Sequence, residues 1–260
     1  MSRLQLEGVS RRFGGLVAVS DLSFTVEPAR ITALIGPNGA GKTTTFNMVS
    51  GLIRPTSGRI TLGAQDLTRL APHRICMAGI GRSFQTPHIF GQMTVLENVM
   101  VGTRVEAPAG LLATGLRFPS AVHEDHDVAD RAMQELVFMN LAHLADRRAG
   151  ALALGQQRMV EVARALATRP KVLMLDEPAA GLTHAEVRGL KETLIKIRDK
   201  GIAVFLVEHN MRFVLRTAQH VVVLNFGEKL VEGPPDQIAN DERVIAAYLG
   251  RGREAQLAQG

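Results

Sequence analysis

Residues 36–43 combine glycines, a lysine and a threonine in a spacing that suits phosphate binding. The stretch "GPNGAGKT" fits the pattern G-x-x-x-x-G-K-[ST], follows the apolar run "ITALI" and precedes a helical stretch. Glycines let the backbone turn tightly, so that amide groups point at an anion. The lysine gives the β- and γ-phosphates a positive charge, and the first threonine hydroxyl is placed to hold Mg²⁺. We therefore expect a nucleotide phosphate site, rather than a plain glycine turn, at Gly36, Pro37, Asn38, Gly39, Ala40, Gly41, Lys42, Thr43 and Thr44.

Two carboxylates follow a second apolar run. In "VLMLDEP", Asp176 and Glu177 stand at the carboxyl end of a predicted buried strand, and this is the edge where open α/β sheets bind their ligands. Asp176 is suited to holding Mg²⁺, directly or through water, and Glu177 to polarising the water that attacks a phosphate. An isolated pair of this kind is often only a solvated strand end. Beside a phosphate loop we expect the functional role.

A third stretch, "LALGQQRMVEVARAL" (152–166), reads as a loop running into a helix. A helix N-terminus attracts anions through its free amides and its dipole. The hydroxyl that usually caps such a helix is missing, because Ala153 and Leu154 stand there. From Met159 onward the apolar residues recur at helical spacing, which indicates a core helix. Three interpretations of the first residues stay open at this point: a phosphate site formed by backbone amides near Gly155, a decayed site, or only the start of a core helix.

The hydrophobic pattern supplies strands that could bring these distant segments to one edge. Alternating apolar and polar residues near the N-terminus predict half-buried strands. Continuous apolar runs farther along predict strands that are buried on both faces, as in a parallel sheet. The predicted strands are 4–9, 22–26, 31–35, 58–62, 172–176, 202–208 and 220–225.

Helical patterns lie between these strands. They begin at Lys42, Thr94 and Thr183, the last two with a glutamate three residues later as a capping box, and a further one covers 126–147. Residues 105–122 show no clear period and are interpreted as an insertion or a connection. The sequence thus predicts an α/β core with a mainly parallel central sheet, an antiparallel layer near the start and a helical subdomain.

The composition excludes several classes of protein. The 260 residues are 46% hydrophobic and 21% charged, which is typical of a globular protein. One cysteine, Cys76, excludes an internal disulfide framework and fits a reducing compartment. No stretch approaches the roughly 18 consecutive apolar residues of a membrane span, and the start lacks an apolar signal core. The net charge of +5 comes without the blocks of like charge that mark a nucleic-acid-binding arm. We expect a cytosolic chain that reaches a membrane only through partners.

The order of the motifs points to a family. The phosphate loop is followed by "SFQTP", "LALGQQR", "VLMLDEP" and "VEHN". In this order the chain resembles the ATP-binding subunits of ABC transporters over nearly its whole length. "GPNGAGKTTTFNMVSGLIRPTSGRI", "RSFQTPHIFGQMTVLENV", "DEPAAGL" and "VEHNM" resemble most closely one ATPase subunit of the branched-chain amino acid importers. The resemblance implies a P-loop NTPase fold, ATP and Mg²⁺ as ligands, and ATP hydrolysis coupled to transport.

The resemblance assigns roles to further residues. Phe13 is similar to the aromatic residue that stacks on adenine, although a core phenylalanine is the alternative. Gln85 resembles the loop glutamine that reaches Mg²⁺ and links ATP to the membrane subunit, with residues 86–93 beside the groove for that subunit. His209 resembles the histidine that senses the γ-phosphate. Together with Lys42 and Glu177, Gln85 and His209 form the implied catalytic set.

The stretch at 152–166 resembles the family signature L-S-G-G-Q, which contacts the nucleotide of the other ATPase subunit. Here the second position is alanine and the third is leucine, and the loop "AAGLT" ends in Thr183 where the family often has aspartate. These departures bear on how much the signature of this chain contributes to catalysis. The nucleotide-binding signature positions are Leu152, Ala153, Gly155 and Gln156.

The resemblance also implies a domain organisation. Residues 1–250 would form one ABC ATPase domain. Its core with the antiparallel layer would consist of 1–87 and 166–250, and its helical subdomain of 88–165. Residues 251–260 have little apolar content, and we expect a disordered tail.

The implied partners are those of an importer. Each ATP would lie between the phosphate loop of one subunit and the signature of a second ATPase subunit, which is a different chain in these importers, although a homodimer could form in isolation. Two membrane permease subunits would bind the pair, and a periplasmic solute-binding protein would act indirectly. No nucleic acid is expected. The location implied is the cytoplasmic face of the bacterial inner membrane, as a peripheral subunit.

Related functions stay open at this point. The same core drives lipopolysaccharide export and the import of urea, amides or related organic acids. Family members that act on nucleic acids carry long coiled coils or two cores, and neither is visible here. A non-enzymatic regulatory subunit is disfavoured because Lys42, Glu177 and His209 are all present. The solute itself cannot be inferred, since the ATPase subunit does not touch it.

Overall fold

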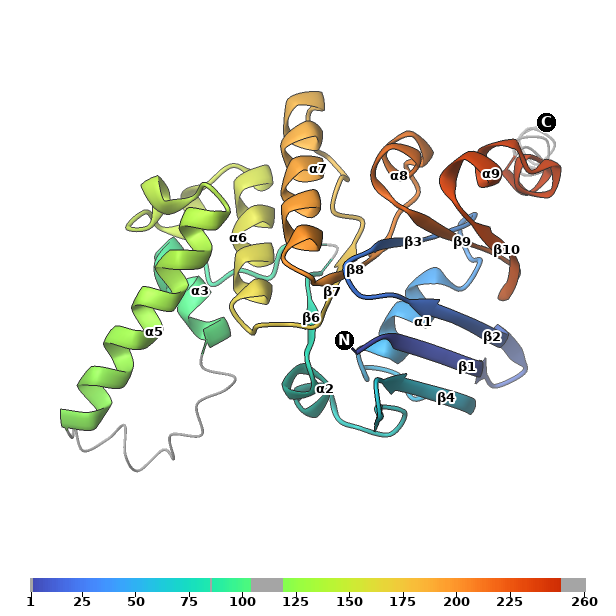
Figure 1. Ribbon diagram of the computed structural model, residues 1–260, viewed down its shortest axis with the longest axis horizontal. Helices are drawn as coiled ribbons and strands as arrows, with labels where there is room; N and C mark the ends of the chain where they lie inside the picture. The colour runs from blue at the N-terminus through green and yellow to red at the C-terminus, as the bar shows by residue number, and fades with distance from the viewer. Residues whose placement is uncertain (1, 85, 104–118, 249–260) are drawn as a thin grey trace.

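The computed structural model describes residues 2–84, 86–103 and 119–248, and of residues 119–126 only the backbone. The elements divide between two sheets and a group of helices (Figure 1). In the view of Figure 1 the helices α3, α5 and α6 lie together at the left, and β1, β2 and β4 lie at the right. Gln85, most of the predicted insertion 105–122 and the predicted tail 251–260 lie outside the described residues.

The central sheet has six strands in the order β10-β9-β3-β8-β7-β6. Its pairs are parallel except that β10 runs antiparallel to β9. Every residue of β3, β7 and β8 is buried, as their continuous apolar runs predict. The strands are β10 (Glu228–Gly233), β9 (His220–Asn225), β3 (Ile31–Ile35), β8 (Ala203–Val207), β7 (Val172–Asp176) and β6 (Ile80–Arg82).

A second, antiparallel sheet has the order β2-β1-β4-β5. Alternate residues of its strands are buried, which is the pattern of a sheet with one face on a core. The predicted antiparallel layer near the N-terminus is therefore confirmed. Its strands are β1 (Leu4–Phe13), β2 (Leu16–Val26), β4 (Ser57–Leu62) and β5 (Gln65–Asp66).

Helices cover the central sheet and extend beyond its β6 edge (Figure 1). The capping boxes predicted at Thr94 and Thr183 are both present: each hydroxyl accepts the amide of the glutamate three residues on, and each glutamate accepts the threonine amide. The α-helices are α1 (Lys42–Val49), α2 (Pro72–Ala78), α3 (Val95–Thr103), α5 (Pro119–Phe138), α6 (Leu154–Leu166), α7 (His184–Asp199), α8 (Met211–Thr217) and α9 (Pro235–Asn240). Two short 3-10 helices, η2 (Ala142–Leu144) and η3 (Ala149–Ala151), precede α6.

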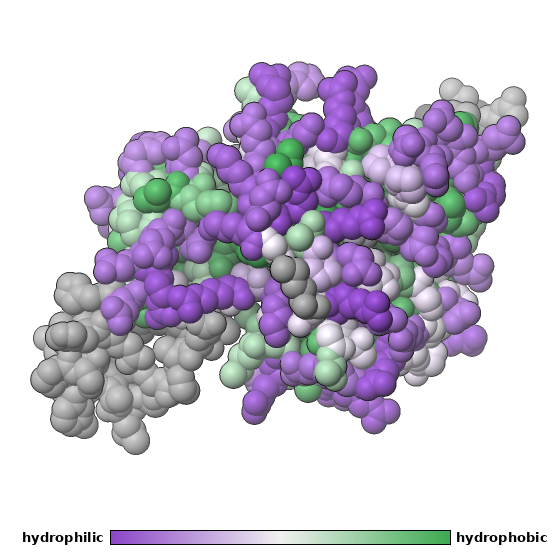
Figure 2. All heavy atoms as spheres, viewed as in Figure 1, coloured by the Kyte–Doolittle hydropathy of each residue, from purple (hydrophilic) through white to green (hydrophobic). Residues whose placement is uncertain are grey.

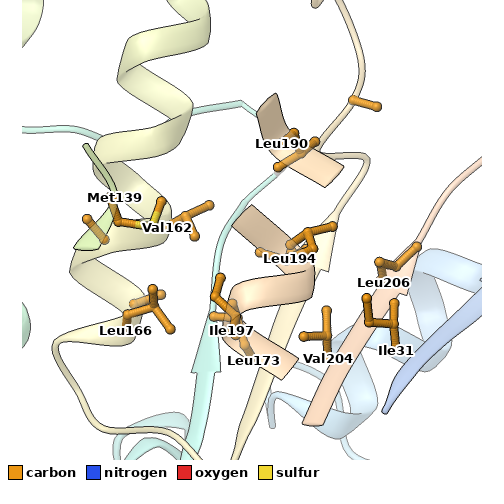
Figure 3. Packing of buried hydrophobic residues seen from close by; sticks show 14 of the residues in the cluster. Ile31, Met139, Val162, Leu166, Leu173, Leu190, Leu194, Ile197, Val204 and Leu206 are labelled. Carbon is orange, nitrogen blue, oxygen red and sulfur yellow. The ribbon is translucent and has the colours of Figure 1, made fainter. Parts of the chain in front are cut away.

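Two hydrophobic cores lie on the two faces of the central sheet. Successive side chains of a strand point to opposite faces, so Leu173 of β7 joins the core under α6 and α7, while Met174 joins the core toward the antiparallel sheet. Figure 3 shows the first core, with side chains of α6 and α7 turned toward the strands. The residues labelled there are Ile31, Met139, Val162, Leu166, Leu173, Leu190, Leu194, Ile197, Val204 and Leu206.

One predicted helix has different bounds. The pattern at 126–147 predicts a single helix, whereas α5 covers Pro119–Phe138 and is followed by short turns. Asn140 has φ +58°, and a left-handed asparagine just past the last turn is a common helix stop. The apolar residues that continue the pattern after Asn140 are buried by the turns instead.

The face in Figure 2 is mainly hydrophilic, with hydrophobic residues in separate small areas. Across the part of the chain that the structure describes, no helix combines the length and apolar character needed to cross a bilayer.

Candidate functional site

The phosphate loop joins the end of β3 to the start of α1. Gly36, Gly39 and Gly41 have φ angles of 153°, 78° and 100°, which residues with side chains rarely adopt. A Cβ on Gly36 would lie 2.2 Å from the carbonyl oxygen of Leu224, and one on Gly41 would lie 2.6 Å from that of Ala18. The close approach of two neighbouring strands therefore requires glycine at both positions.

Lys42 is folded over its own loop. It is only 7% exposed, and its Nζ donates to the carbonyl oxygens of Gly36 at 2.7 Å and Pro37 at 3.0 Å. The amides in the first turn of α1 have no acceptor within the helix, and the positive end of the helix dipole favours an anion there. A buried ammonium beside such amides is the donor set that binds phosphate in these loops. The residues present thus fit a nucleotide phosphate.

Asp176 ends β7 within the electrostatic reach of this loop. It is 6% exposed, and burial raises the pKa of its carboxyl; the charge of Arg82 lowers that pKa, Glu177 raises it and Lys42 lowers it. Thr43, the predicted hydroxyl ligand, is exposed. Among the described residues no group of three or more His, Cys, Asp or Glu side chains could hold a metal ion. Mg²⁺ is commonly bound by one or two carboxylates together with phosphate oxygens and water, and Asp176 could supply such a carboxylate.

Glu177 and His209 come together at this edge. Nδ1 of His209 lies 3.3 Å from Oε1 of Glu177; the His209 side chain is 55% exposed and the Glu177 side chain 21%. Glu177 has φ +47°; its amide donates to Val207 at 2.9 Å and its carbonyl accepts from Nη1 of Arg158 at 2.9 Å. These backbone bonds hold a strained residue in place. The carboxylate can accept a proton from water, and the imidazole next to it can donate or accept one.

Glu208 is a residue of this site that the sequence pattern does not single out. Its side chain is fully buried and accepts the amides of Ala179 at 2.9 Å, His209 at 3.2 Å and Asn210 at 3.3 Å. Burial raises the pKa of its carboxyl, while the amide bonds from Ala179 and Asn210 lower it. One side chain thus ties the loop after β7 to the loop after β8. In the sequence, the feature that could point to Glu208 is a carboxylate that directly follows the apolar run of β8.

The loop at 152–156 lies apart from the phosphate loop. Ala153 is the N-cap of α6 without a side-chain bond, as its methyl group requires, and Oε1 of Gln156 accepts the Ala153 amide at 3.3 Å. A Cβ on Gly155 would lie 2.3 Å from Oε1 of Glu186 in α7. Helix α6 lies with α3 and α5 at the left of Figure 1, whereas α1, which follows the phosphate loop, lies at the right.

The remaining predicted residues are placed as follows. Phe13 ends β1, is 42% exposed and carries the guanidinium of Arg11 at 4.4 Å from its ring centroid. An exposed ring can stack on a base, whereas a core phenylalanine would be buried. Asn38 is exposed and Thr44 is half-buried. Gln85 lies outside the described residues, so its predicted role is not addressed by this geometry.

A family model described as "ABC transporter" matches residues 19–180, which include the phosphate loop, the 152–156 loop and both strand-end carboxylates. The chain belongs to the ABC transporter family. A second family model, described as "Branched-chain amino acid ATP-binding cassette transporter", matches residues 228–254.

Individual relatives agree with the family. The cassette is 42% identical to the high-affinity branched-chain amino acid transport ATP-binding protein BraF of Pseudomonas aeruginosa, covering 96% of this chain and 99% of that protein. It is 36% identical to the lipopolysaccharide export system ATP-binding protein LptB of Haemophilus influenzae, covering 96% and 98%. Among solved structures, the ADP conformation of the ABC transporter cassette MJ1267 matches with a TM-score of 0.84 at 32% identity, covering 96% and 99%.

Proposed function

We propose that this cassette is the ATP-hydrolysing subunit of an importer for branched-chain amino acids. The hydrolytic part rests on one observation: a buried lysine loop, a buried aspartate and a Glu177–His209 pair lie at the carboxyl ends of the adjacent strands β3, β8 and β7. The class of solute is supported by the likeness to BraF and by the match at 228–254, both of which concern branched-chain amino acid transport.

In the proposed mechanism the β- and γ-phosphates lie on the amides of the phosphate loop, and Lys42 exchanges its carbonyl partners for phosphate oxygens. Thr43 and Asp176, with Gln85, would hold a Mg²⁺ ion, which would neutralise charge that develops on those oxygens. The Glu177 carboxylate accepts a proton from the attacking water, and His209 contacts the γ-phosphate. Adenine stacks on Phe13. The protein thus contributes mainly position and charge.

The second half of each nucleotide site would come from another ATPase subunit. Its signature would face Lys42 of this chain, and Leu152, Ala153, Gly155 and Gln156 of this chain would face its phosphate loop. ATP binds both surfaces only when the pair is closed, so it shifts the equilibrium toward closure, and hydrolysis releases it. The domain division into 1–87 with 166–250, and 88–165, belongs to this proposal, as do two permease subunits, a periplasmic binding protein and a position at the cytoplasmic face of the inner membrane.

The experiment that tests hydrolysis uses the assembled transporter. Lys42→Ala removes the ammonium from the phosphate cradle, so ATP turnover of the site should be abolished. Lys196→Ala on α7 removes an exposed lysine and serves as the control. Wild-type turnover in the Lys42→Ala complex would refute the assignment of the loop.

A second experiment distinguishes the solute. Related cassettes serve lipopolysaccharide export, and urea or amide import is a further alternative. Purified complex with its binding protein, in proteoliposomes, should hydrolyse ATP faster when leucine, isoleucine or valine is present. Stimulation by urea, amides or lipopolysaccharide, with none by these amino acids, would replace the proposed solute and leave the ATPase role intact.

A further inference from the structure

A buried carboxylate on α6 has no part in the proposed mechanism. Glu161 is 2% exposed, and its oxygens accept the backbone amides of Phe84 at 3.3 Å and His88 at 3.1 Å. Burial raises the pKa of this carboxyl, while the two amide bonds lower it. A buried carboxylate that accepts amides from another segment fixes that segment firmly, since either group left unpaired in the interior is costly.

Arg164, one turn later on α6, holds the same segment. Its Nη2 donates to the carbonyl oxygen of His88 at 2.7 Å and lies 3.5 Å from Oε1 of Glu161. Its guanidinium carbon lies 5.6 Å from the centroid of the Phe90 ring. We name Phe84 with residues 86–90 the β6–α3 segment, after the elements that it connects. Helix α6 thus holds this segment at Phe84 and His88 through Glu161, and again at His88 through Arg164.

The same helix carries the signature loop at its N-terminus. Seven residues separate Leu154 from Glu161, which at the rise of an α-helix is about 10 Å along one rigid rod. Val160, Val162 and Ala163 are buried against neighbouring elements, so the helix moves as one unit. A displacement of the signature loop therefore displaces Glu161 and Arg164 with it.

We propose that Glu161 and Arg164 are positioning residues that make the β6–α3 segment move with the signature loop. The proposal rests on the proposed function, in which the signature loop binds the nucleotide of the partner ATPase and residues 86–93 adjoin the membrane subunit. Through this attachment, closure on ATP at one end of α6 reaches the segment next to the permease. Neither residue touches the nucleotide.

Hydrogen exchange tests the attachment in the isolated full chain. In Glu161→Ala the amides of Phe84 and His88 lose their acceptor, so they should exchange at least about tenfold faster, while amides in the middle of α6 stay protected. Glu192→Ala, which removes an exposed glutamate from α7, is the control. Unchanged exchange at both amides would overturn the proposal. Should Glu161→Ala fold poorly, Glu161→Gln keeps the volume and one acceptor oxygen, and it should raise exchange at one of the two amides.

Coupling is tested in the assembled transporter. Glu161→Ala and Arg164→Ala should each lower the amount of solute transported per ATP by about threefold or more, with the KM for ATP unchanged. The double variant should add little, because both side chains hold His88. Transport and hydrolysis falling in strict parallel would show a structural role and overturn the proposal. A wild-type complex without solute-stimulated hydrolysis would contradict the proposed function instead, and the exchange experiment would still decide the attachment.

Discussion

Glu208 shows what a single buried carboxylate does at the scale of one residue. Its side chain accepts three amides from the segments that follow β7 and β8, and so it holds together the two loops in which Glu177 and His209 lie. Asp176 and Glu161 are buried in the same way, and burial raises the pKa of all three carboxyls. Each charge in the interior makes folding depend on pH.

The pH dependence of stability tests Glu208. A carboxyl whose folded pKa is raised binds its proton more tightly in the folded state, so the free energy of unfolding falls as pH rises from the ordinary value of 4.5 through the raised pKa. The Glu208→Gln variant has no such proton, so its free energy of unfolding should fall less steeply over this pH window. At neutral pH the same variant should lose about 1–3 kcal/mol, because an amide group faces donors that the carboxylate satisfied.

Urea unfolding at several pH values measures both effects. Asp176→Asn, measured in parallel, shows how much of the slope comes from another buried carboxyl. Identical slopes for the wild-type chain and Glu208→Gln would contradict the role of Glu208.

At the scale of elements, hydrophobic periodicity predicts the strands well because burial repeats with the strand. The fully buried β3, β7 and β8 and the two capping boxes are visible in the sequence for this reason. The end of α5 is not, since the apolar residues after Asn140 continue the helical spacing although turns bury them. The only local sign of the stop is the asparagine itself.

The candidate site divides in the same way. The phosphate loop, Asp176 and Glu177 are predictable because their residue types and spacing are required by the chemistry of phosphate. Glu208 and Glu161 are not, because each acts through backbone amides that lie far away in the sequence, and backbone donors leave no residue-specific pattern. Only the fold shows which segments these carboxylates hold.

Gly155 gives a prediction for the packing of α6 on α7. Gly155→Asp would force a side chain against the Glu186 carboxylate and set two negative charges together, so the signature loop should no longer approach a nucleotide. ATP-driven transport by the assembled complex should fall at least about tenfold. The loss cannot come from helix propensity, since aspartate is favourable in the first turn of a helix.

Gly189→Asp is the matched control for this variant. Gly189 lies on α7 with nothing within 4 Å of an added Cβ, so the same substitution there should leave transport unchanged. Normal transport in Gly155→Asp would contradict the placement of this loop on the nucleotide of the partner.

At the scale of the whole molecule, the proposed function gives one chain two half-sites, each of which needs another chain. The phosphate loop with its carboxylates lies at the strand ends, and the 152–156 loop lies at the start of α6 (Figure 1). A ligand that binds the pair of chains but not the separate chains stabilises the pair, and more strongly as its concentration rises above its Kd. The molecule is therefore expected to be incomplete as a monomer.

Glu177→Gln tests this expectation. The amide cannot accept a proton from water, so steady-state hydrolysis in the assembled complex should fall about 100-fold or more while ATP affinity is kept. Because bound ATP then persists, ATP should convert the variant from one chain to two, alone or with the partner ATPase, as measured by light scattering. The exposed Glu192→Gln is the control. A variant that hydrolyses ATP normally, or stays a single chain in both mixtures, would contradict the model.

The two bonds from the Lys42 ammonium to Gly36 and Pro37 have a kinetic consequence. They order the loop around the ammonium before any ligand arrives, so we expect little ordering entropy to be lost on association. When ATP binds, the Lys42 ammonium then exchanges the carbonyl oxygens of Gly36 and Pro37 for phosphate oxygens. Association with a single chain should be fast and free of a slow rearrangement, leaving closure of the pair as the step that sets the pace.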